Sequence, residues 1–469
     1  MKNKTFPIKS IRILLPAFLF FGSTSFTLGQ PCDPIQTAKF LISNGSANDR
    51  FGNAVAVDGN TMIIGAAAED DNGEDSGSVY IYTRTDTGWD QQSKLLPNDG
   101  APFDFFGFSV DLDGDTAIIG ARLNDENGTR AGAAYIFTRN NGTWTQQAKL
   151  LASDGVAEDR FGYSVSIHGD TAAIGARLAD ITGASYIFTR TNNTWTQQAK
   201  LIPSDGNGGE QFGCSISIHG DAVLIGAYHD FAPLYNSGSA YLFTRNNGLW
   251  SEHQKLIPSD GDFGDSFGYA VSIENDTAVI GALWNKDAGF ASGSAYVFTR
   301  NDEHWTEQAK LLPTDLAAGD TFGLSVSISE NTILIGSQGH DDNGSSSGAS
   351  YIFTRNNTVW TQQAKILPND GDENDVFGGS VSISGNTTVL GAQGYDHFSN
   401  NSGTAYVFDL QCIFCPPDLN NDGSLNFTDI SDFLAAFSTN DPVADFNNDG
   451  SWNFLDVSAY LADFSAGCP

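Results

Sequence analysis

The chain repeats one short pattern seven times. The dipeptide Phe-Gly recurs at intervals of 55 residues, with a single interval of 51, and it starts at Phe51, Phe106, Phe161, Phe212, Phe267, Phe322 and Phe377. A fixed period of roughly 50 residues is typical of architectures in which similar units pack side by side. The repeat therefore limits the possible folds more strongly than any local propensity does.

Each repeat predicts four short β-strands. The third copy contains FGYSVSI from Phe161, TAAIGA from Thr171, GASYIFTR from Gly183 and WTQQAKLI from Trp195. A single four-stranded sheet cannot bury both of its faces, whereas seven sheets around an axis bury each face against the next sheet. We therefore predict an all-β fold, a seven-bladed β-propeller with four-stranded blades.

The two ends of the repeated region predict how the ring closes. The seventh repeat stops after its third strand, at Tyr406 to Gln411, and lacks the outer strand that begins with Trp in the third repeat. A matching segment, Gln36 to Leu41, precedes the first Phe-Gly. We expect this N-terminal strand to complete the seventh blade, because a linear stack would gain nothing from such a permutation.

The N-terminal segment, residues 1–29, predicts export. Four cationic residues precede an apolar run at 13–21, and small residues before Gln30 offer a cleavage site, which is typical of a signal peptide. The apolar run is much shorter than the roughly 20 residues that span a bilayer. We expect a secreted, extracellular or cell-surface protein without a transmembrane segment; a retained signal anchor is the alternative.

The charge balance excludes one class of partner. The chain has 23 Lys and Arg against 56 Asp and Glu, so its formal net charge is -33. Nucleic-acid binding needs clustered cations that displace counterions from phosphates. We therefore expect no nucleic-acid partner.

Four of the five cysteines are predicted to form disulfides. Superposing the last strands of the seventh repeat on a complete repeat places Cys32 and Cys412 at adjacent hairpin positions, and exported proteins retain such bonds. Cys415 would then pair with Cys468, although Cys412 and Cys415 also form a Cys-x-x-Cys pair that redox proteins use. Cys214 lies within a predicted first strand, where we expect a buried, inert thiol.

The repeats resemble FG-GAP repeats, which build the head of integrin α-subunits. The resemblance rests on Phe-Gly, the alternating strand after it and a later Ile-Gly-Ala such as Ile174-Gly175-Ala176, and it covers residues 30–411. It implies a seven-bladed propeller that serves recognition. The Pro of the family pattern is replaced in all seven repeats. The loop at Asp113-Gly114-Asp115 is also too short to encircle a calcium ion, so the calcium of integrin-like blades is not carried over to this chain, and metal binding by the propeller stays open.

A linker at 412–417 leads to an acidic C-terminal module at 418–469. Two segments of the module match an EF-hand loop, with oxygen donors at alternate positions and Gly at the sixth. The predicted ligands of two Ca²⁺ ions are Asp418, Asn420, Asp422, Ser424, Asn426 and Asp429, then Asp445, Asn447, Asp449, Ser451, Asn453 and Asp456. Each loop is followed by an apolar stripe with helical spacing, and we expect the two helices to pack together. The alternative is a pair of Asx turns in an acidic linker.

The C-terminal module resembles dockerins, in particular the variant that ends in Gly-Cys, here Gly467-Cys468. Both loops have Asp at position 12, and no helix precedes either loop. The resemblance implies attachment to a cohesin-like protein or to another surface or scaffold protein. Phe427-Thr428 and Phe454-Leu455 stand where cellulosomal dockerins often carry the residues that select the partner, which leaves the partner class open.

The repeated side chains predict structural roles, and the irregular loops predict the binding site. An acid stands two residues before every Phe-Gly, and this recurrence favours loop capping over acid/base pairs or a metal ring. The one Trp in most repeats favours packing over a sugar platform. Function should lie where the repeat is broken. The loops between second and third strands give the candidate ligand residues Tyr228, His229, Asp230, Tyr235, Trp284, Lys286, Tyr395 and His397. Ordinary loop variation is the alternative.

These observations predict a secreted, non-catalytic binding or adhesion protein. Its propeller loops would recognise an extracellular protein or glycan, and its calcium-dependent tail would attach it to a partner. A dockerin-bearing polysaccharide hydrolase or lyase on a propeller fold is the main alternative, because dockerins commonly accompany such enzymes. A structural surface-layer component is a third possibility.

Overall fold

The structure is a computed structural model. It describes residues 33–42, 45–231, 234–396, 401–411, 417, 419, 427–439, 441–446 and 450–466. Several predicted residues lie outside this part of the chain: the signal peptide, His397, the four cysteines Cys32, Cys412, Cys415 and Cys468, and the calcium ligands Asp418, Asn420, Asp422, Ser424, Asn426, Asn447 and Asp449.

Seven antiparallel sheets of four strands form the blades of a β-propeller, as predicted. Blade 1 contains β2 (Phe51–Asp58), β3 (Thr61–Ala66), β4 (Ser78–Thr85) and β5 (Gly88–Leu95). Blade 2 contains β6 (Phe106–Asp113), β7 (Thr116–Ala121), β8 (Ala133–Asn140) and β9 (Thr143–Leu150). Blade 3 contains β10 (Phe161–His168), β11 (Thr171–Ala176), β12 (Ala184–Thr191) and β13 (Thr194–Leu201).

The other four blades follow the same order. Blade 4 contains β14 (Ile216–His219), β15 (Ala222–Ala227), β16 (Ser239–Asn246) and β17 (Leu249–Leu256). Blade 5 contains β18 (Phe267–Glu274), β19 (Thr277–Ala282), β20 (Ser294–Asn301) and β21 (His304–Leu311). Blade 6 contains β22 (Ser325–Ser329), β23 (Thr332–Ser337), β24 (Ala349–Asn356) and β25 (Val359–Ile366). Blade 7 contains β26 (Ser380–Ser384), β27 (Thr387–Ala392), β28 (Thr404–Gln411) and β1 (Asp33–Phe40).

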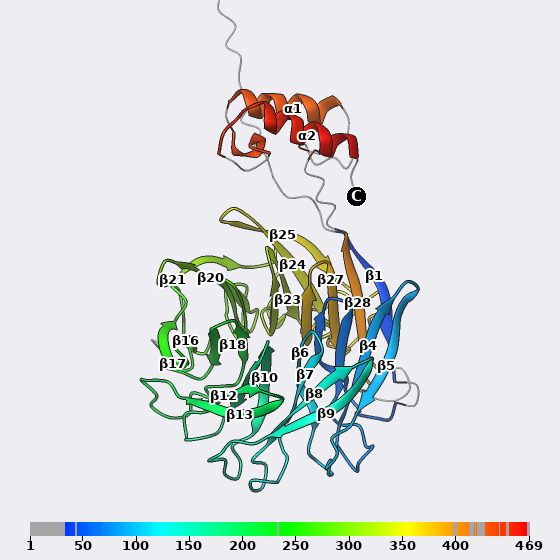
Figure 1. Ribbon diagram of the computed structural model, residues 1–469, viewed down its shortest axis with the longest axis vertical. Helices are drawn as coiled ribbons and strands as arrows, with labels where there is room; N and C mark the ends of the chain where they lie inside the picture. The colour runs from blue at the N-terminus through cyan, green and yellow to red at the C-terminus, as the bar shows by residue number, and fades with distance from the viewer. Residues whose placement is uncertain are drawn as a thin grey trace, which may run out of the picture.

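The N-terminal strand closes the ring. β1 pairs antiparallel with β28, with Ala38 opposite Val407 and Lys39 opposite Tyr406. The Thr404 hydroxyl also donates a hydrogen bond of 2.8 Å to the Phe40 carbonyl. In Figure 1 the blue strand β1 lies beside the orange strand β28. The predicted closure is confirmed.

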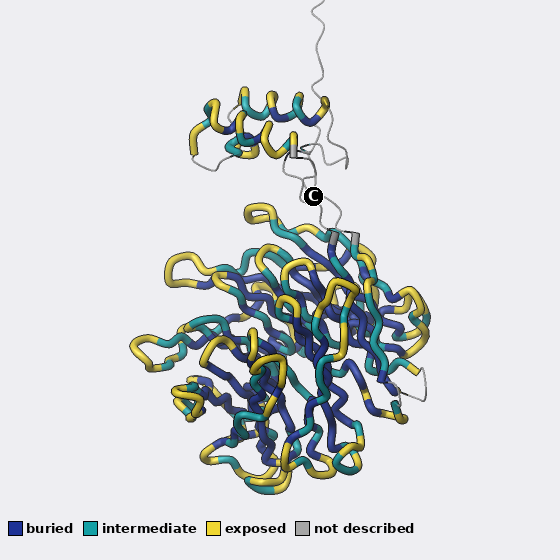
Figure 2. The backbone as a smooth tube through the Cα atoms, turned by 45° about the vertical axis from the view of Figure 1, so that its right-hand side comes forward, coloured by how far each residue is buried: buried dark blue, intermediate teal, exposed yellow. Residues whose placement is uncertain are grey.

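The hydrophobic core is divided among the seven contacts between neighbouring blades. One cluster joins blades 2 and 3, with Ile118 on one side and Phe161 on the other, and another joins blades 7 and 1, with Val407 and Phe51. In each blade the Phe of Phe-Gly meets a Tyr of the third strand edge-on, as Phe161 meets Tyr186 at 5.4 Å. Figure 2 shows the buried strands in dark blue and the exposed turns in yellow. Each blade therefore buries its faces against its neighbours, which is why a closed ring is needed.

The two glycines of the repeat permit close approach between blades. Gly162 of the third Phe-Gly has a φ of +82°, which a residue with a side chain adopts only under strain. Gly175 of Ile-Gly-Ala faces Gly213 of the next blade, and a methyl group at Gly175 would overlap the Gly213 carbonyl oxygen. The motif is thus a steric requirement of the inner strands.

The strand order divides the ring into two faces. The short hairpins between first and second strands and between third and fourth strands lie on one face, called here the hairpin face. The loops between second and third strands lie on the opposite face with the loops that connect blades, and this is called the loop face. Hydrogen bonds join the two kinds of loop, for example from Gly209 N–H to the Ile181 carbonyl at 2.9 Å and from Gly264 N–H to the Tyr235 carbonyl at 3.1 Å.

The C-terminal region contains two helices, α1 (Phe427–Ser438) and α2 (Phe454–Ala466), with a short 3₁₀ turn η1 (Pro442–Ala444) between them. The helices share a small apolar cluster in which the rings of Phe433 and Tyr460 stack at 4.0 Å. The predicted helix pairing is confirmed. Among the described residues, no helix has both the length and the apolar character needed to cross a membrane.

Candidate functional site

The acids that precede each Phe-Gly cap the loops between blades. All seven are buried, and each carboxylate accepts a hydrogen bond from the backbone N–H three residues earlier: Ala101 for Asp104, Val156 for Asp159, and likewise for Asp49, Glu210, Asp265, Asp320 and Asp375. Burial raises the pKa of Asp49 and of Asp375 to about 6. The predicted capping role is confirmed.

A second repeated feature is a lysine held between acids on the loop face. Lys255 of blade 4 pairs with Asp205 at 2.6 Å and with Asp230 at 2.7 Å. Asp230, one of the candidate ligand residues, also accepts hydrogen bonds from Ser239 and Tyr241 and is buried. Its carboxylate thus belongs to the repeated ion pair of its blade.

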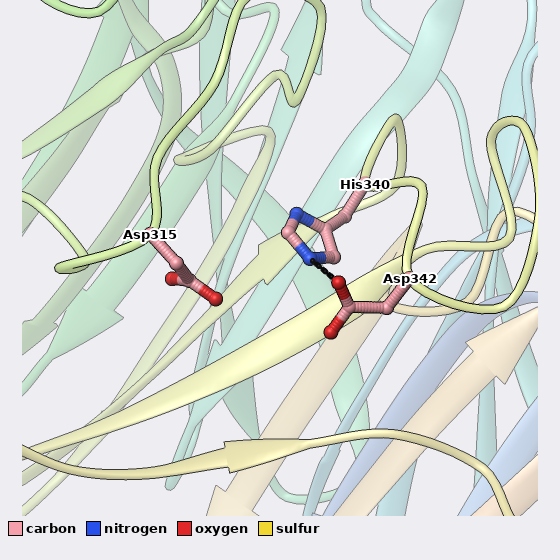
Figure 3. A group of neighbouring side chains, drawn as sticks. All are labelled: Asp315, His340 and Asp342. Atoms are coloured by element: carbon pink, nitrogen blue, oxygen red, sulfur yellow. Dashed lines mark ion pairs between the residues drawn. The ribbon is translucent and has the colours of Figure 1, made fainter.

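Blade 6 carries a variant of this ion pair that resembles a metal site. The side chains of Asp315, His340 and Asp342 converge, as Figure 3 shows. The Lys365 ammonium, however, lies 2.8 Å from Asp315 and 2.5 Å from His340 Nε2, and it also contacts Asp342. Lys365 therefore occupies the place where a cation would sit, and Lys255 and Lys310 lie between two acids in blades 4 and 5 in the same way. We assign a structural role to the cluster.

The Trp series and Cys214 also have structural roles. The Trp195 indole N–H donates a hydrogen bond of 2.7 Å to Gln147 of the neighbouring outer strand, and Trp144 bonds to Gln92 in the same way. Cys214 is a free thiol, and burial raises its pKa to about 11. The predicted packing of the Trp series and the predicted burial of Cys214 are both confirmed.

The irregular loops of blades 4 and 5 form an exposed aromatic patch on the loop face. The patch consists of Phe231, Tyr235, Phe263, Trp284 and Phe290, which are 51%, 50%, 57%, 39% and 72% exposed. Tyr235 lies between two other members, with its ring 4.7 Å from Phe231 and 5.7 Å from Phe263. Trp284 packs 5.8 Å from Phe290. Five large aromatic side chains from three loops are thus presented to solvent together.

One cation connects the two halves of the aromatic patch. The Lys286 ammonium lies 5.9 Å from the centre of the Phe263 ring and bonds to the Phe263 carbonyl, while Trp284 stands two residues earlier in the same loop. Lys286 also lies 3.7 Å from the buried carboxylate of Asp265. The patch therefore combines flat apolar faces with a positive charge.

The central channel opens on the loop face in a cavity of about 260 Å³, called here the channel mouth. Arg50, Phe105, Phe108 and Tyr269 are among the residues that line it. Tyr228 packs against Tyr269 with the ring centres 5.2 Å apart. The Tyr228 hydroxyl donates a hydrogen bond of 2.7 Å to Gln211.

His229 belongs to the same group of residues at the channel mouth. Its Nδ1 lies 3.1 Å from the Gln211 amide, and its ring lies 4.3 Å from that of Tyr228. Burial, with a smaller contribution from Arg177, lowers the pKa of His229. The imidazole is therefore held in its neutral form at a pH where a free histidine begins to take up a proton.

The candidate ligand residues thus fall into separate groups. Tyr235, Trp284 and Lys286 belong to the aromatic patch, whereas Tyr228 and His229 lie at the channel mouth. Tyr395 lies in blade 7, where the Lys39 ammonium sits 3.7 Å above its ring. The structure does not bring Tyr395 together with either group.

The candidate ligand residues from the sequence omit three members of the aromatic patch, Phe231, Phe263 and Phe290. They also omit four residues at the channel mouth, Arg122, Arg177, Tyr163 and Tyr269. Phe263 lies in a loop between blades, whereas the prediction considered only the loops within blades. Arg122 and Arg177 occupy the position of the Pro in the FG-GAP pattern. That substitution was visible in the sequence, and the ring geometry shows that this position faces the channel mouth.

The C-terminal loops are described in part. Asp429 and Asp456 are fully buried in the first turns of α1 and α2. In the second loop Gly450 has a φ of +76°, and its N–H donates a hydrogen bond of 2.8 Å to Asp445. Asp456 accepts a hydrogen bond of 2.8 Å from Asn453 N–H. Ser451 stands directly after the turn. The described residues therefore have the oxygen-rich composition and the glycine turn that a calcium loop requires.

The fold is a seven-bladed β-propeller with four-stranded blades and two distinct faces. The model of the FG-GAP repeat family matches seven segments, residues 35–82, 89–137, 144–188, 195–243, 250–298, 305–353 and 360–408. The chain therefore belongs to the FG-GAP repeat family. Each match begins in an outer strand and ends in the third strand of the next blade. The N-terminal strand is thus the start of the first unit.

One solved structure shows a similar fold. A chain in the crystal structure of the Mitotic Checkpoint Complex aligns with a TM-score of 0.51 and 11% sequence identity, over 87% of this chain and 98% of that chain. No curated protein matches the sequence.

Proposed function

We propose that this is a secreted, non-catalytic binding or adhesion protein whose loop face recognises an extracellular protein or glycan. The aromatic patch carries the proposal. Exposed aromatic rings gathered on one surface are typical of binding sites, because they remove a large apolar area from water on contact at a small cost in side-chain entropy. The rigid ring holds the three loops in place, and the side chains that repeat in every blade have structural roles.

The C-terminal module is proposed to be a dockerin-like domain that binds two Ca²⁺ ions and attaches the protein to a cohesin-like or other surface or scaffold partner. Asp429, Asp445 and Asp456, with Ser451 and Asn453, are the described residues that would supply oxygen ligands. Bound calcium would neutralise the buried carboxylates and tie each loop to its helix. The paired helices support this reading.

Export is proposed as well, with a signal peptide at residues 1–29 and an extracellular or cell-surface location. The disulfide between Cys32 and Cys412 would suit that environment. The register of β1 and β28 supports the pairing, since Asp33 lies opposite Gln411 and these residues adjoin the two cysteines.

A glycan array and a pull-down from cell surfaces test the proposed function with the full chain. We expect ligand binding that is lost in the double variant Tyr235→Ala, Phe263→Ala. The matched control is Leu249→Ala, because Leu249 is 76% exposed on the hairpin face. Equal ligand binding by the double variant and the control would contradict the proposal that the loop face is the binding surface. Turnover of a polysaccharide by the native chain would favour the enzyme alternative.

A further inference from the structure

Four arginines stand apart from the other cations of the chain. The described residues include nineteen of the 23 Lys and Arg. Fourteen of these nineteen form ion pairs with Asp or Glu, and Arg355 bonds to Asn331. The four that remain are Arg50, Arg122, Arg160 and Arg177. Although the chain has 56 acids, none of these four pairs with a carboxylate of the described residues.

All four arginines belong to the channel mouth. Arg50 and Arg160 directly precede a Phe-Gly, and Arg122 and Arg177 directly follow an Ile-Gly-Ala, so all four lie where the inner strands of blades 1 to 3 meet the loop face. Arg50 lines the cavity. The pKa of Arg122 falls to about 10, mainly through burial, and the positive charges of Arg160, Arg177 and Arg50 lower it further. The other three guanidinium groups therefore lie close enough to Arg122 to repel it.

The aromatic rings of the mouth hold two of these guanidinium groups in place. The Arg122 guanidinium lies 3.9 Å from the centre of the Phe108 ring, and the Arg177 guanidinium lies 4.1 Å from that of Tyr163. Arg177 also donates a hydrogen bond of 2.7 Å to Gln211. The Nε atoms of Arg122, Arg160 and Arg177 are buried and have no hydrogen-bond acceptor within the described part of the chain. Buried donors without acceptors and like charges without counterions both cost stability.

We propose that the channel mouth binds the carboxylate or sulfate group of a short acidic saccharide. An anion would accept hydrogen bonds from the arginines and relieve their mutual repulsion, and guanidinium groups bind such oxyanions in a bidentate manner. The proposal rests on the proposed recognition function of the loop face, and it names the class of ligand.

The surroundings of the four arginines favour a short saccharide over a long polyanion. The cavity of about 260 Å³ is small, and the aromatic side chains of Phe105, Phe108 and Tyr269 are among those that line it. The chain as a whole has a net charge of -33, so a long polyanion would be repelled wherever it ran beyond the mouth. A short ligand that presents one charged group to the arginines avoids this repulsion.

Titration calorimetry with the full chain tests the site, with trigalacturonate as the acidic probe and galactotriose as the neutral one. We expect trigalacturonate to bind, with an affinity that falls as salt is added, and galactotriose to bind at least tenfold more weakly. The double variant Arg122→Gln, Arg177→Gln should lose trigalacturonate binding at least tenfold. The control Arg190→Gln, which removes a cation paired with Asp170 on the hairpin face, should bind like the native chain. Equal binding of both sugars, or an unaffected double variant, would overturn the proposal.

Two further measurements separate saccharide binding from a folding role of the arginines and from peptide binding. Because the arginines repel one another, we expect the double variant to melt at the same temperature as the native chain or higher. A large loss of stability would instead show that the arginines stabilise the fold, which would contradict the proposal.

Hexaglutamate tests an acidic peptide as the ligand. Binding of hexaglutamate as tight as that of trigalacturonate would show that the site recognises an acidic peptide and would overturn the saccharide proposal. Ligand binding that persists at the aromatic patch without any anion effect would overturn this inference and leave the proposed function standing.

Discussion

At the scale of single residues, one repeated hydrogen bond to a serine joins neighbouring inner strands, and two blades depart from it, because Ala56 in blade 1 and Asp111 in blade 2 replace the serine. Ser166 Oγ accepts the Ile218 N–H, and Ser217, Ser272, Ser327 and Ser382 do the same for the blades that follow them. Asp111 occupies this position in blade 2 and accepts the Ile167 N–H with its carboxylate. Burial raises the pKa of Asp111 from 3.8 to about 6, despite the hydrogen bonds that oppose the shift.

We predict that Asp111→Ser stabilises the propeller at neutral pH by about 2 kcal/mol. Because the pKa is raised in the folded state, the native chain binds more protons than the unfolded chain between about pH 4 and pH 6, and stability falls as the pH rises through this range. Serine removes the cost of the buried charge and restores the repeated hydrogen bond. Denaturant unfolding of both proteins at about pH 4 and pH 7 checks this; a gain at pH 4 that equals the gain at pH 7 would contradict it.

At the scale of strands and helices, the alternation of residues and the Phe-Gly period predicted the blades, because the same local pattern meets the same neighbours in every copy. The side chains in the loops could not be predicted in this way. Phe263 and Tyr235 lie in different loops that the sequence separates, and they meet only because adjacent blades bring a connecting loop beside the loop of the previous blade. The location of Arg122 and Arg177 at the channel mouth likewise could not be predicted from one repeat, because the channel exists only when the seven first strands surround it.

The two C-terminal helices give a second prediction at this scale. The apolar cluster around Phe433 and Tyr460 is small, so calcium should supply much of the folding free energy of this module. We expect a chelator to remove the helical signal in circular dichroism while the β-signal of the propeller persists, and added Ca²⁺ to restore the helices. Asp456→Ala should show the loss without chelator. A helical signal that does not depend on calcium would contradict the proposal.

At the scale of the whole molecule, the way in which the repeats are permuted along the sequence matches the way in which the ring closes. The sequence predicted the closure of blade 7 because one end lacked a strand and the other end carried one, and β1 lies beside β28 in the structure. The closure of the ring does not indicate what the ring binds, because the contacts that close it are the same as those between any two neighbouring blades. That information comes from the places where blades differ.

The proposed bond between Cys32 and Cys412 would fasten the closed ring. It would restrict a loop of nearly 380 residues, and in the chain-entropy model such a bond contributes at most about 6 kcal/mol. We predict one free thiol per unreduced, denatured chain, which is Cys214, and a lower melting temperature after reduction. Cys32→Ser should show the lower melting temperature without a reductant. A count of three or five free thiols would contradict the predicted pairing.

Hydrogen–deuterium exchange with and without a ligand captured from the glycan array or the cell surface tests the loop face most directly. The account predicts protection in the loops that follow β15, β17 and β19 and around the channel mouth, with the hairpin face unchanged. Protection confined to the hairpin face, or a bound polysaccharide that is cleaved during the measurement, would contradict it.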